Sequence, residues 1–236
     1  MPTESQAARR ARAARVAKLL ARTYPDARCA LDHRNAFELL IATILSAQCT
    51  DAKVNEVTAV LFPKYPTAKA LAAADPADLE AIVRPTGFYR QKAKSIQATA
   101  QGIVSDFGGE VPRSLEQLVT LRGVARKTAN VVRGVAFGEP GLAIDTHMQR
   151  VNRRLGLVRG EDPEEIEREL AELLPPRDWT TWTLRVIHHG RVCCDAKKPR
   201  CQACALAQEC PSAGKLAPAP EPSARTASRR RGEPRP

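Results

Sequence analysis

Four cysteines lie within 17 residues near the C-terminus, in the stretch CDAKKPRCQACALAQEC. They are Cys194, Cys201, Cys204 and Cys210, with the spacing C-x6-C-x2-C-x5-C. Four thiolates are the ligands that a four-coordinate metal centre needs, but the spacing matches neither the paired C-x2-C of a zinc ribbon nor the short gaps of a ferredoxin. We therefore expect a metal, either iron–sulfur or zinc, to hold a compact loop together.

The composition indicates a globular protein of one large or two small domains, since 43% of its 236 residues are hydrophobic. No run of about 18 apolar residues is present, and the basic N-terminus lacks the apolar centre of a secretory signal, so we expect no membrane span and no signal. Seven cysteines, four of them clustered, argue against a disulfide framework and for a reducing cytoplasm. Cys29, Cys49 and Cys193 are then small apolar residues, with Cys193 an alternative ligand in the wrong register.

The net charge of +11 is concentrated at the two ends of the chain. Residues 1–28 hold seven Lys and Arg against two acids, and residues 215–236 hold six against two. Solubility is one explanation, but concentrated positive charge is also typical of nucleic-acid binding, where each neutralised phosphate releases counterions. We expect the basic ends to raise non-specific affinity for DNA.

Helical patterns dominate the chain, and no segment shows sustained period-2 alternation, so we predict an all-α fold. Residues 36–48 are apolar nearly all round, as in a core helix. Residues 88–107 place Ile96 and Ile103 on one side, with Lys92 and Lys94 expected elsewhere. Capping signals precede further helices at Asp75-Pro76, at Asp162-Pro163 and at Ser114. The Pro-, Ala- and Arg-rich tail from about Lys215 cannot bury enough surface to become ordered.

Residues 114–137 predict a tight helical hairpin, because two helical patterns flank only Arg122–Ala125. Gly123 can adopt a positive φ, and the second helix would then direct free N–H groups outward as an anion site. An ordinary hairpin in a bundle is the alternative. Lys127 lies just inside that second helix, where the positive helix end disfavours its charged form, and partial burial would make it a usable nucleophile. A solvated or phosphate-binding lysine is the alternative. Asp145 is either an N-cap or a carboxylate at the mouth of a cleft.

Five motifs together resemble the endonuclease III family, the iron–sulfur DNA glycosylases of the helix-hairpin-helix superfamily. They are LSAQCTD (45–51), TGFYRQKA (86–93), LRGVARKTANVV (121–132), IDTHMQRV (144–151) and HGRVCCDAKKPRC with the cysteines that follow. The resemblance covers about residues 29–210. It implies a six-helix barrel domain (29–139) containing the hairpin (114–137), an iron–sulfur domain (1–28 plus 140–214), an active-site cleft between them, and a disordered basic tail (215–236).

The resemblance also implies an activity in base excision repair. The family cuts the N-glycosidic bond of oxidised pyrimidines in duplex DNA and then nicks the strand at the abasic site. Lys127 matches the nucleophile that forms a Schiff base, Asp145 matches the assisting carboxylate, and the four cysteines match the ligands of a [4Fe-4S] cluster. The expected partner is double-stranded DNA with oxidised or abasic lesions, bound by a monomer in the bacterial cytoplasm.

The resemblance further implies a set of DNA contacts. Gln48 would fill the space left by a flipped base, and Phe88 would wedge into the opposite strand, where the family usually inserts a leucine. Asp51 is a weaker candidate for the base pocket. The remaining DNA-binding candidates are Arg122, Gly123, Val124, Ala125 and Arg126 of the hairpin, His147, and the loop residues Lys197, Lys198 and Arg200.

Three positions depart from the family pattern. The hairpin usually reads LPGVGRK, but here Arg122 replaces the proline and Ala125 the second glycine, and Phe88 stands where leucine is usual. Two other functions remain as alternatives. An adenine-mismatch glycosylase shares the hairpin and cysteines but lacks the lysine nucleophile, so Lys127 argues against it. A cluster-bearing, non-catalytic DNA-binding or redox-sensing protein would need neither Lys127 nor Asp145.

Overall fold

The computed structural model describes residues 4–216, which consist of helices and connecting segments without a strand. The all-α prediction is therefore confirmed for this part of the chain. The α-helices are α1 (Gln6–Thr23), α2 (Ala36–Leu45), α3 (Asp51–Lys64), α4 (Ala68–Ala72), α5 (Pro76–Val83), α6 (Tyr89–Phe107), α7 (Leu115–Leu118), α8 (Arg126–Phe137), α9 (Thr146–Arg154), α10 (Pro163–Leu173), α11 (Trp179–Val192) and α12 (Ala213–Leu216). Short 3-10 turns are η1 (Arg84–Thr86), η2 (Pro176–Asp178), η3 (Cys201–Ala203) and η4 (Ala207–Glu209).

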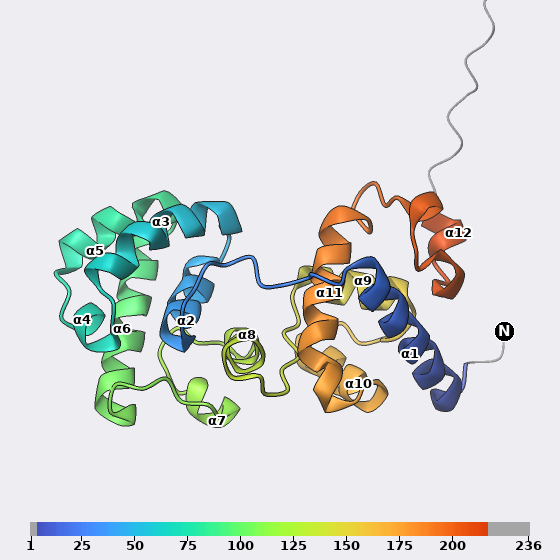
Figure 1. Cartoon of the computed structure of the whole chain (residues 1–236), viewed down its shortest axis with the longest axis horizontal. Helices are drawn as coiled ribbons and strands as arrows, with labels where there is room; N and C mark the ends of the chain where they lie inside the picture. Colours follow the sequence, from blue (N-terminus) through green and yellow to red (C-terminus); the bar gives the residue numbers. More distant parts are fainter. Residues whose placement is uncertain (1–3, 217–236) are drawn as a thin grey trace, which may run out of the picture.

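One hydrophobic core is built from α2 to α8, which occupy one end of the molecule and its middle in Figure 1. Helix α2 lies at its centre, with every residue from Phe37 to Leu45 buried. The helix ends at Leu45, three residues before the end of the apolar pattern that predicted it. It cannot continue through Gln48, whose φ of 52° lies in the left-handed region.

A second core joins the two ends of the chain. Helix α1 contributes Val16 and Leu20, which pack with side chains of α9, α10 and α11 such as Met148 and Trp182. In Figure 1 these helices form the other end of the molecule, and the chain passes from α1 across to α2 and returns after α8. The second core is therefore complete only when residues far apart in the sequence come together.

Three of the cations of α1, Arg10, Arg12 and Arg15, bind protein groups. Arg12 donates hydrogen bonds to the carbonyl oxygens of Leu155, Gly156 and Glu209, and Arg15 forms an ion pair with Glu209 at 2.8 Å. This α1 surface is thus less available to DNA than its charge suggests.

The predicted capping residues are confirmed at Asp75, Ser114 and Asp162, whose side chains each accept a backbone N–H from the first helical turn. Lys215, near which the tail was expected to begin, lies in the short helix α12. The rest of the tail lies outside the described residues. None of the helices between residues 4 and 216 combines the length and the apolar character needed to cross a bilayer.

Candidate active site and metal centre

A cavity of about 160 Å³ lies where the two cores meet, and it contains three of the predicted site residues. Its walls come from α2, the start of α3, α8, the segment leading into α9, and α11. Lys127, Asp145 and Asp51 all line it. The structure therefore brings together a lysine, a carboxylate and a second acid that are up to 94 residues apart in the sequence.

Lys127 stands in the first turn of α8, immediately after the hairpin. Its side chain is exposed at the rim of the cavity, so the partial burial considered from the sequence is absent. Within residues 4–216, no ion pair involves Lys127. An amine that is exposed and unpaired at a cavity rim can reach an electrophile placed in the cavity.

Asp145 is both the N-cap of α9 and part of the cavity wall. Its Oδ1 accepts the backbone N–H of Met148 at 2.7 Å, which confirms the capping prediction. The residues before it, Leu142 to Ile144, are buried and fix the entry of the chain. The cap uses one carboxylate oxygen, and within residues 4–216 no hydrogen bond engages the other.

The hairpin has the predicted glycine geometry. Gly123 has a φ of 88°, and a Cβ at this position would lie 3.1 Å from the Cβ of Ser95 on α6. Thr99 of the same helix donates to the carbonyl oxygen of Arg122 at 2.6 Å, which ties the turn to α6. Ala125 caps α8 without a side-chain acceptor, so the first N–H groups of α8 have no side-chain partner there.

Two predicted contact residues have partners of their own. Arg126 forms a two-pronged ion pair with Glu167 of α10, at 2.8 and 2.9 Å. Asp51 accepts from Arg191 of α11 at 2.7 Å, and both residues line the cavity. These pairs connect helices of the first core to helices of the second, so their side chains are already engaged before any ligand binds.

The other predicted DNA contacts lie outside the cavity wall. Gln48 and Phe88 are exposed, and Phe88 keeps 70% of its surface accessible. His147 packs against Gly190 of α11, and its Nδ1 accepts from Arg150 at 3.0 Å. Burial lowers the pKa of His147, while the nearby Asp145 carboxylate partly opposes this. His147 is therefore a neighbour of the site rather than part of its lining.

The cysteines meet in a single pocket between α9, the end of α11 and the loop that follows it. Cys194, Cys201, Cys204 and Cys210 line this pocket together with Cys193. Burial raises the pKa of the Cys204 thiol to about 12 and also raises that of Cys210. A set of soft thiol donors in one apolar pocket fits a metal cluster.

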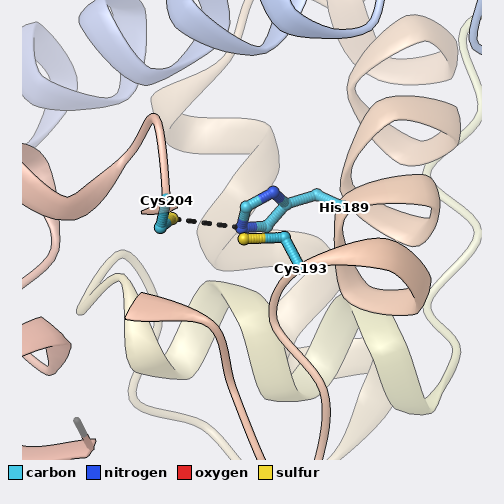
Figure 2. Close-up of side chains that lie close together, drawn as sticks. All are labelled: His189, Cys193 and Cys204. Atoms are coloured by element: carbon cyan, nitrogen blue, oxygen red, sulfur yellow. Dashed lines mark hydrogen bonds between the residues drawn. The ribbon is translucent and has the colours of Figure 1, made fainter. Parts of the chain in front are cut away.

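Figure 2 shows His189 and Cys193 from the end of α11 facing Cys204 from the opposite side of the pocket. The three donor atoms lie within 4.8 Å of one another. The Nε2 of His189 is 3.7 Å from the Cys204 sulfur, and its Nδ1 is 2.9 Å from the Tyr24 hydroxyl. Burial lowers the pKa of His189 to about 4, so the imidazole is neutral. Cys193, interpreted from the sequence mainly as a small apolar residue, is thus a fifth thiol at the metal site.

Arg154 of α9 holds the basic loop after Cys194 through hydrogen bonds to its backbone. This arginine donates to the carbonyl oxygens of Asp195 and Ala196, and to the Cys194 sulfur at 3.3 Å. The lysines at 197 and 198 and Arg200 are all exposed, and the backbone N–H groups of both lysines bind the Asp195 carboxylate. The loop therefore presents its cations outward while the cysteines face the pocket.

Sequence reasoning missed several residues that build the two sites. They are Tyr24, Arg154, His189 and Arg191. His189 and Arg191 belong to the quoted motif HGRVCC, so the motif marked their importance without giving their partners. No local signal in the sequence points to Tyr24 or Arg154, because their partners are tens to more than a hundred residues away.

Comparisons with known proteins agree with this arrangement. The model of the HhH-GPD superfamily of base excision DNA repair proteins matches residues 41–176. Endonuclease III of Synechocystis sp. is 50% identical over 88% of this chain and 95% of its own length. The Bacillus subtilis endonuclease III is 48% identical over 79% of this chain and 86% of its own.

Solved structures give the same result. A trapped endonuclease III–DNA covalent intermediate, an estranged-adenine complex, superposes with a TM-score of 0.83 at 44% identity and covers 87% of this chain and 97% of its own. A thermostable thymine-DNA glycosylase superposes with a TM-score of 0.76 at 25% identity, covering 86% of this chain and 97% of its own. The chain therefore belongs to the HhH-GPD superfamily of base excision DNA repair proteins and, within it, to the endonuclease III family of DNA glycosylase/AP lyases.

Proposed function

We propose that this chain removes oxidised pyrimidines from duplex DNA and then cleaves the strand at the abasic site, with Lys127 as the nucleophile and Asp145 as the assisting carboxylate. The observation that carries the proposal is that both residues line one cavity between the two cores. The similar endonuclease III trapped as a covalent intermediate with DNA supports a nucleophile on the protein. We also propose that the two cores correspond to domains of residues 29–139 and 1–28 with 140–214.

The chemistry begins with a base turned out of the helix into the cavity. The unprotonated Nζ of Lys127 attacks C1′ while the glycosidic bond breaks, and the base leaves with the bonding electrons and takes up a proton. The free oxygen of Asp145 stabilises the positive charge that develops on the sugar. Ring opening then gives an imine between Lys127 and C1′. Loss of a C2′ proton expels the 3′ phosphate, and water releases the lysine.

DNA is held, in this proposal, by three groups of residues around the cavity. The hairpin offers the uncapped N–H groups at the start of α8 to a phosphate, and Arg122 is exposed beside them. The basic loop at 197–200 contacts the backbone on the side of the metal centre. Gln48 enters the space vacated by the flipped base, and the Phe88 ring wedges into the opposite strand.

Borohydride trapping tests the lyase reaction. An oligonucleotide with one oxidised pyrimidine should become covalently linked to the wild-type protein and to the Lys94→Ala control, whereas Lys127→Ala should give no adduct. Failure of the wild type to form an adduct on oxidised or abasic DNA would rule out the lysine mechanism. An adduct with Lys127→Ala would move the nucleophile to another amine. Duplexes with an adenine mismatch should show no base release, which separates this activity from the adenine-specific alternative.

The metal, we propose, is a [4Fe-4S] cluster bound by Cys194, Cys201, Cys204 and Cys210. These four sulfurs would bind as thiolates and would hold the loop against the end of α11. Iron and sulfide analysis of the purified protein tests this assignment, with zinc and no sulfide as the contrary result. Cys204→Ser should lose iron, whereas Cys193→Ser should retain it. An equal loss of iron in both variants would show that Cys193 is also a ligand.

A further inference from the structure

Gln48 and Phe88 share an unusual backbone conformation. Within residues 4–216 they are the two non-glycine residues with a positive φ, at 52° and 46°. The left-handed region costs an ordinary L-residue about 1–2 kcal/mol. Such strain persists only where surrounding contacts hold the backbone in place. Both of the residues proposed to enter the DNA therefore project from turns that some other part of the molecule must fix.

Lys92 provides that contact for Phe88. Its backbone N–H bonds the carbonyl oxygen of Phe88 at 3.0 Å, as the first such bond of α6. Its Nζ folds back and donates to the carbonyl oxygen of Thr86 at 2.7 Å. A single residue thus binds the carbonyls on both sides of Gly87, which itself has a φ of 70°. Because Phe88 caps α6 without a side-chain hydrogen bond, these bonds define the start of the helix.

The residues that hold this turn are buried, whereas the aromatic residue that it carries is exposed. Lys92 and Thr86 are 5% and 3% exposed, while Phe88 is 70% exposed. The Thr86 hydroxyl donates to the carbonyl oxygen of Val83 at 2.8 Å, which anchors the turn to the end of α5. The aromatic ring is therefore held outward by buried polar bonds rather than by contacts of its own.

A buried ammonium is costly, so it needs hydrogen-bond partners that offset its desolvation. Burial lowers the pKa of Lys92, and the Cys49 thiol, next to Gln48, is close enough for its ionised form to oppose this shift. A hydrophobic residue of similar length would fill the same space without the desolvation penalty. What it could not do is bind the Thr86 carbonyl.

We propose that Lys92 is a positioning residue for base extrusion, because its ammonium holds the Thr86–Phe88 turn in the conformation that directs the Phe88 ring into the DNA stack. This inference rests on the proposed role of Phe88 as the inserted residue. Lys92 touches no reacting atom and acts only through Phe88. Its removal should therefore weaken the steps that need an opposite strand and spare those that do not.

A double-mutant cycle on Lys92 and Phe88 tests this directly. The variants are Lys92→Met, Phe88→Ala and the two combined, with Lys94→Met as the control because Lys94 is exposed on the same helix. One substrate is an oxidised pyrimidine in duplex DNA, and the other is an abasic site in a single strand, which has no stack to open. Rates are measured under single-turnover conditions with the enzyme in excess, and thermal melting checks the fold.

We expect Lys92→Met to slow duplex excision at least about tenfold and to change single-strand cleavage by less than about twofold. In the Phe88→Ala background, the same substitution should have less than about a twofold further effect on the duplex. The proposal would be overturned if the rate losses of Lys92→Met and Phe88→Ala multiplied in the double variant. Equal rate losses of Lys92→Met on duplex and single-stranded DNA would also overturn it. If Phe88→Ala alone leaves duplex excision unchanged, the proposed insertion itself fails. If Phe88→Ala slows duplex excision but Lys92→Met leaves it unchanged, only the role of Lys92 is rejected.

A second pair of variants keeps the test valid if Lys92→Met does not fold. Gly87 and Gly138 have φ values of 70° and 68°, and neither has an atom within 4 Å of an added Cβ. Alanine at either position therefore introduces similar backbone strain without a clash. Gly87→Ala should reproduce the duplex-specific loss, whereas Gly138→Ala should not. Equal duplex rates for the two alanine variants would overturn the proposal.

Discussion

Arg191 of α11 donates to Asp51 at the start of α3 at 2.7 Å, and the pair closes one side of the cavity that holds Lys127 and Asp145. The two residues belong to different cores and are 140 positions apart in the sequence. Their ion pair therefore sets the separation of two walls that no covalent connection holds close together.

Breaking this pair should impair catalysis more than stability. We expect Arg191→Leu to lower single-turnover excision at least about tenfold, with a change in the free energy of unfolding below about 1 kcal/mol because the pair is partly exposed. Arg153→Leu is the matched control. Its guanidinium pairs with Glu161 at 2.8 Å, and both arginine side chains are 46% exposed. Equal rate losses in the two variants would show that the cavity is not the cause.

Arg12 should be important for stability rather than for DNA affinity. Its side chain is 12% exposed, and it binds Glu4 and three backbone carbonyls around the metal loop. Arg12→Met leaves those carbonyls without a donor, so the free energy of unfolding should fall by about 2 kcal/mol or more. Chemical denaturation measures this, with the exposed Arg22→Met changing stability by less than about 0.5 kcal/mol. A weaker salt dependence of DNA binding without a loss of stability would contradict the structural role.

The segment leading to Asp145 depends on a glycine. A Cβ on Gly141 would clash with the carbonyl oxygen of Asn130 on α8, whereas one on Gly214 would meet no atom within 4 Å. Gly141→Ala should cost about 1–3 kcal/mol of stability by overpacking and should reduce excision by displacing Asp145. Gly214→Ala should be neutral in both thermal melting and activity assays. Wild-type behaviour of Gly141→Ala would show that this close approach is not required.

Acid should loosen α1 from the metal loop. The Arg15 guanidinium lowers the pKa of Glu209 below its usual value of 4.5. Because the folded pKa is depressed, the ion pair stabilises the protein above pH 4.5, and this contribution is lost as the pH falls through the folded pKa. Glu209→Gln should therefore melt earlier than the wild type near neutral pH, with the difference shrinking toward pH 3.5. Glu56→Gln provides the comparison, and a difference that persists in acid would refute the linkage.

The sequence predicted helices and caps well because both depend on neighbouring residues. Asp75, Ser114 and Asp162 were predicted as N-caps from residues no more than four positions away, and each cap is observed. Lys92 shows the limit of this reasoning. It was expected away from the apolar side of its helix, yet it is buried beside Ile96, because its long side chain reaches back to a carbonyl six residues earlier. The hydrophobic pattern predicts that a charged residue is exposed, and it gives no sign of the hydrogen bond that allows Lys92 to be buried.

The candidate site was predictable as a set of residues but not as a geometry. The motifs gave Lys127, Asp145 and the four cysteines, while the pairing of Asp51 with Arg191 and of Arg126 with Glu167 depends on how two cores meet. Cys193 was not counted among the candidate ligands because it lies outside the C-x6-C-x2-C-x5-C spacing. The structure nevertheless places it in the same pocket. Such contacts are determined by long-range packing, which a local pattern does not encode.

The path of the chain through the two cores determines the order in which a newly made protein can be completed. The helices of the first core end at Phe137, so that core can form while the rest of the chain is still being synthesised. Helix α1 leaves the ribosome first but must wait for α9 to α11 and the cysteine loop before its apolar face is covered. The cavity residues on α11, the last of which is Arg191, therefore emerge after both Lys127 and Asp145. A chain terminated before α11 would retain Lys127 without the opposing wall of the cavity.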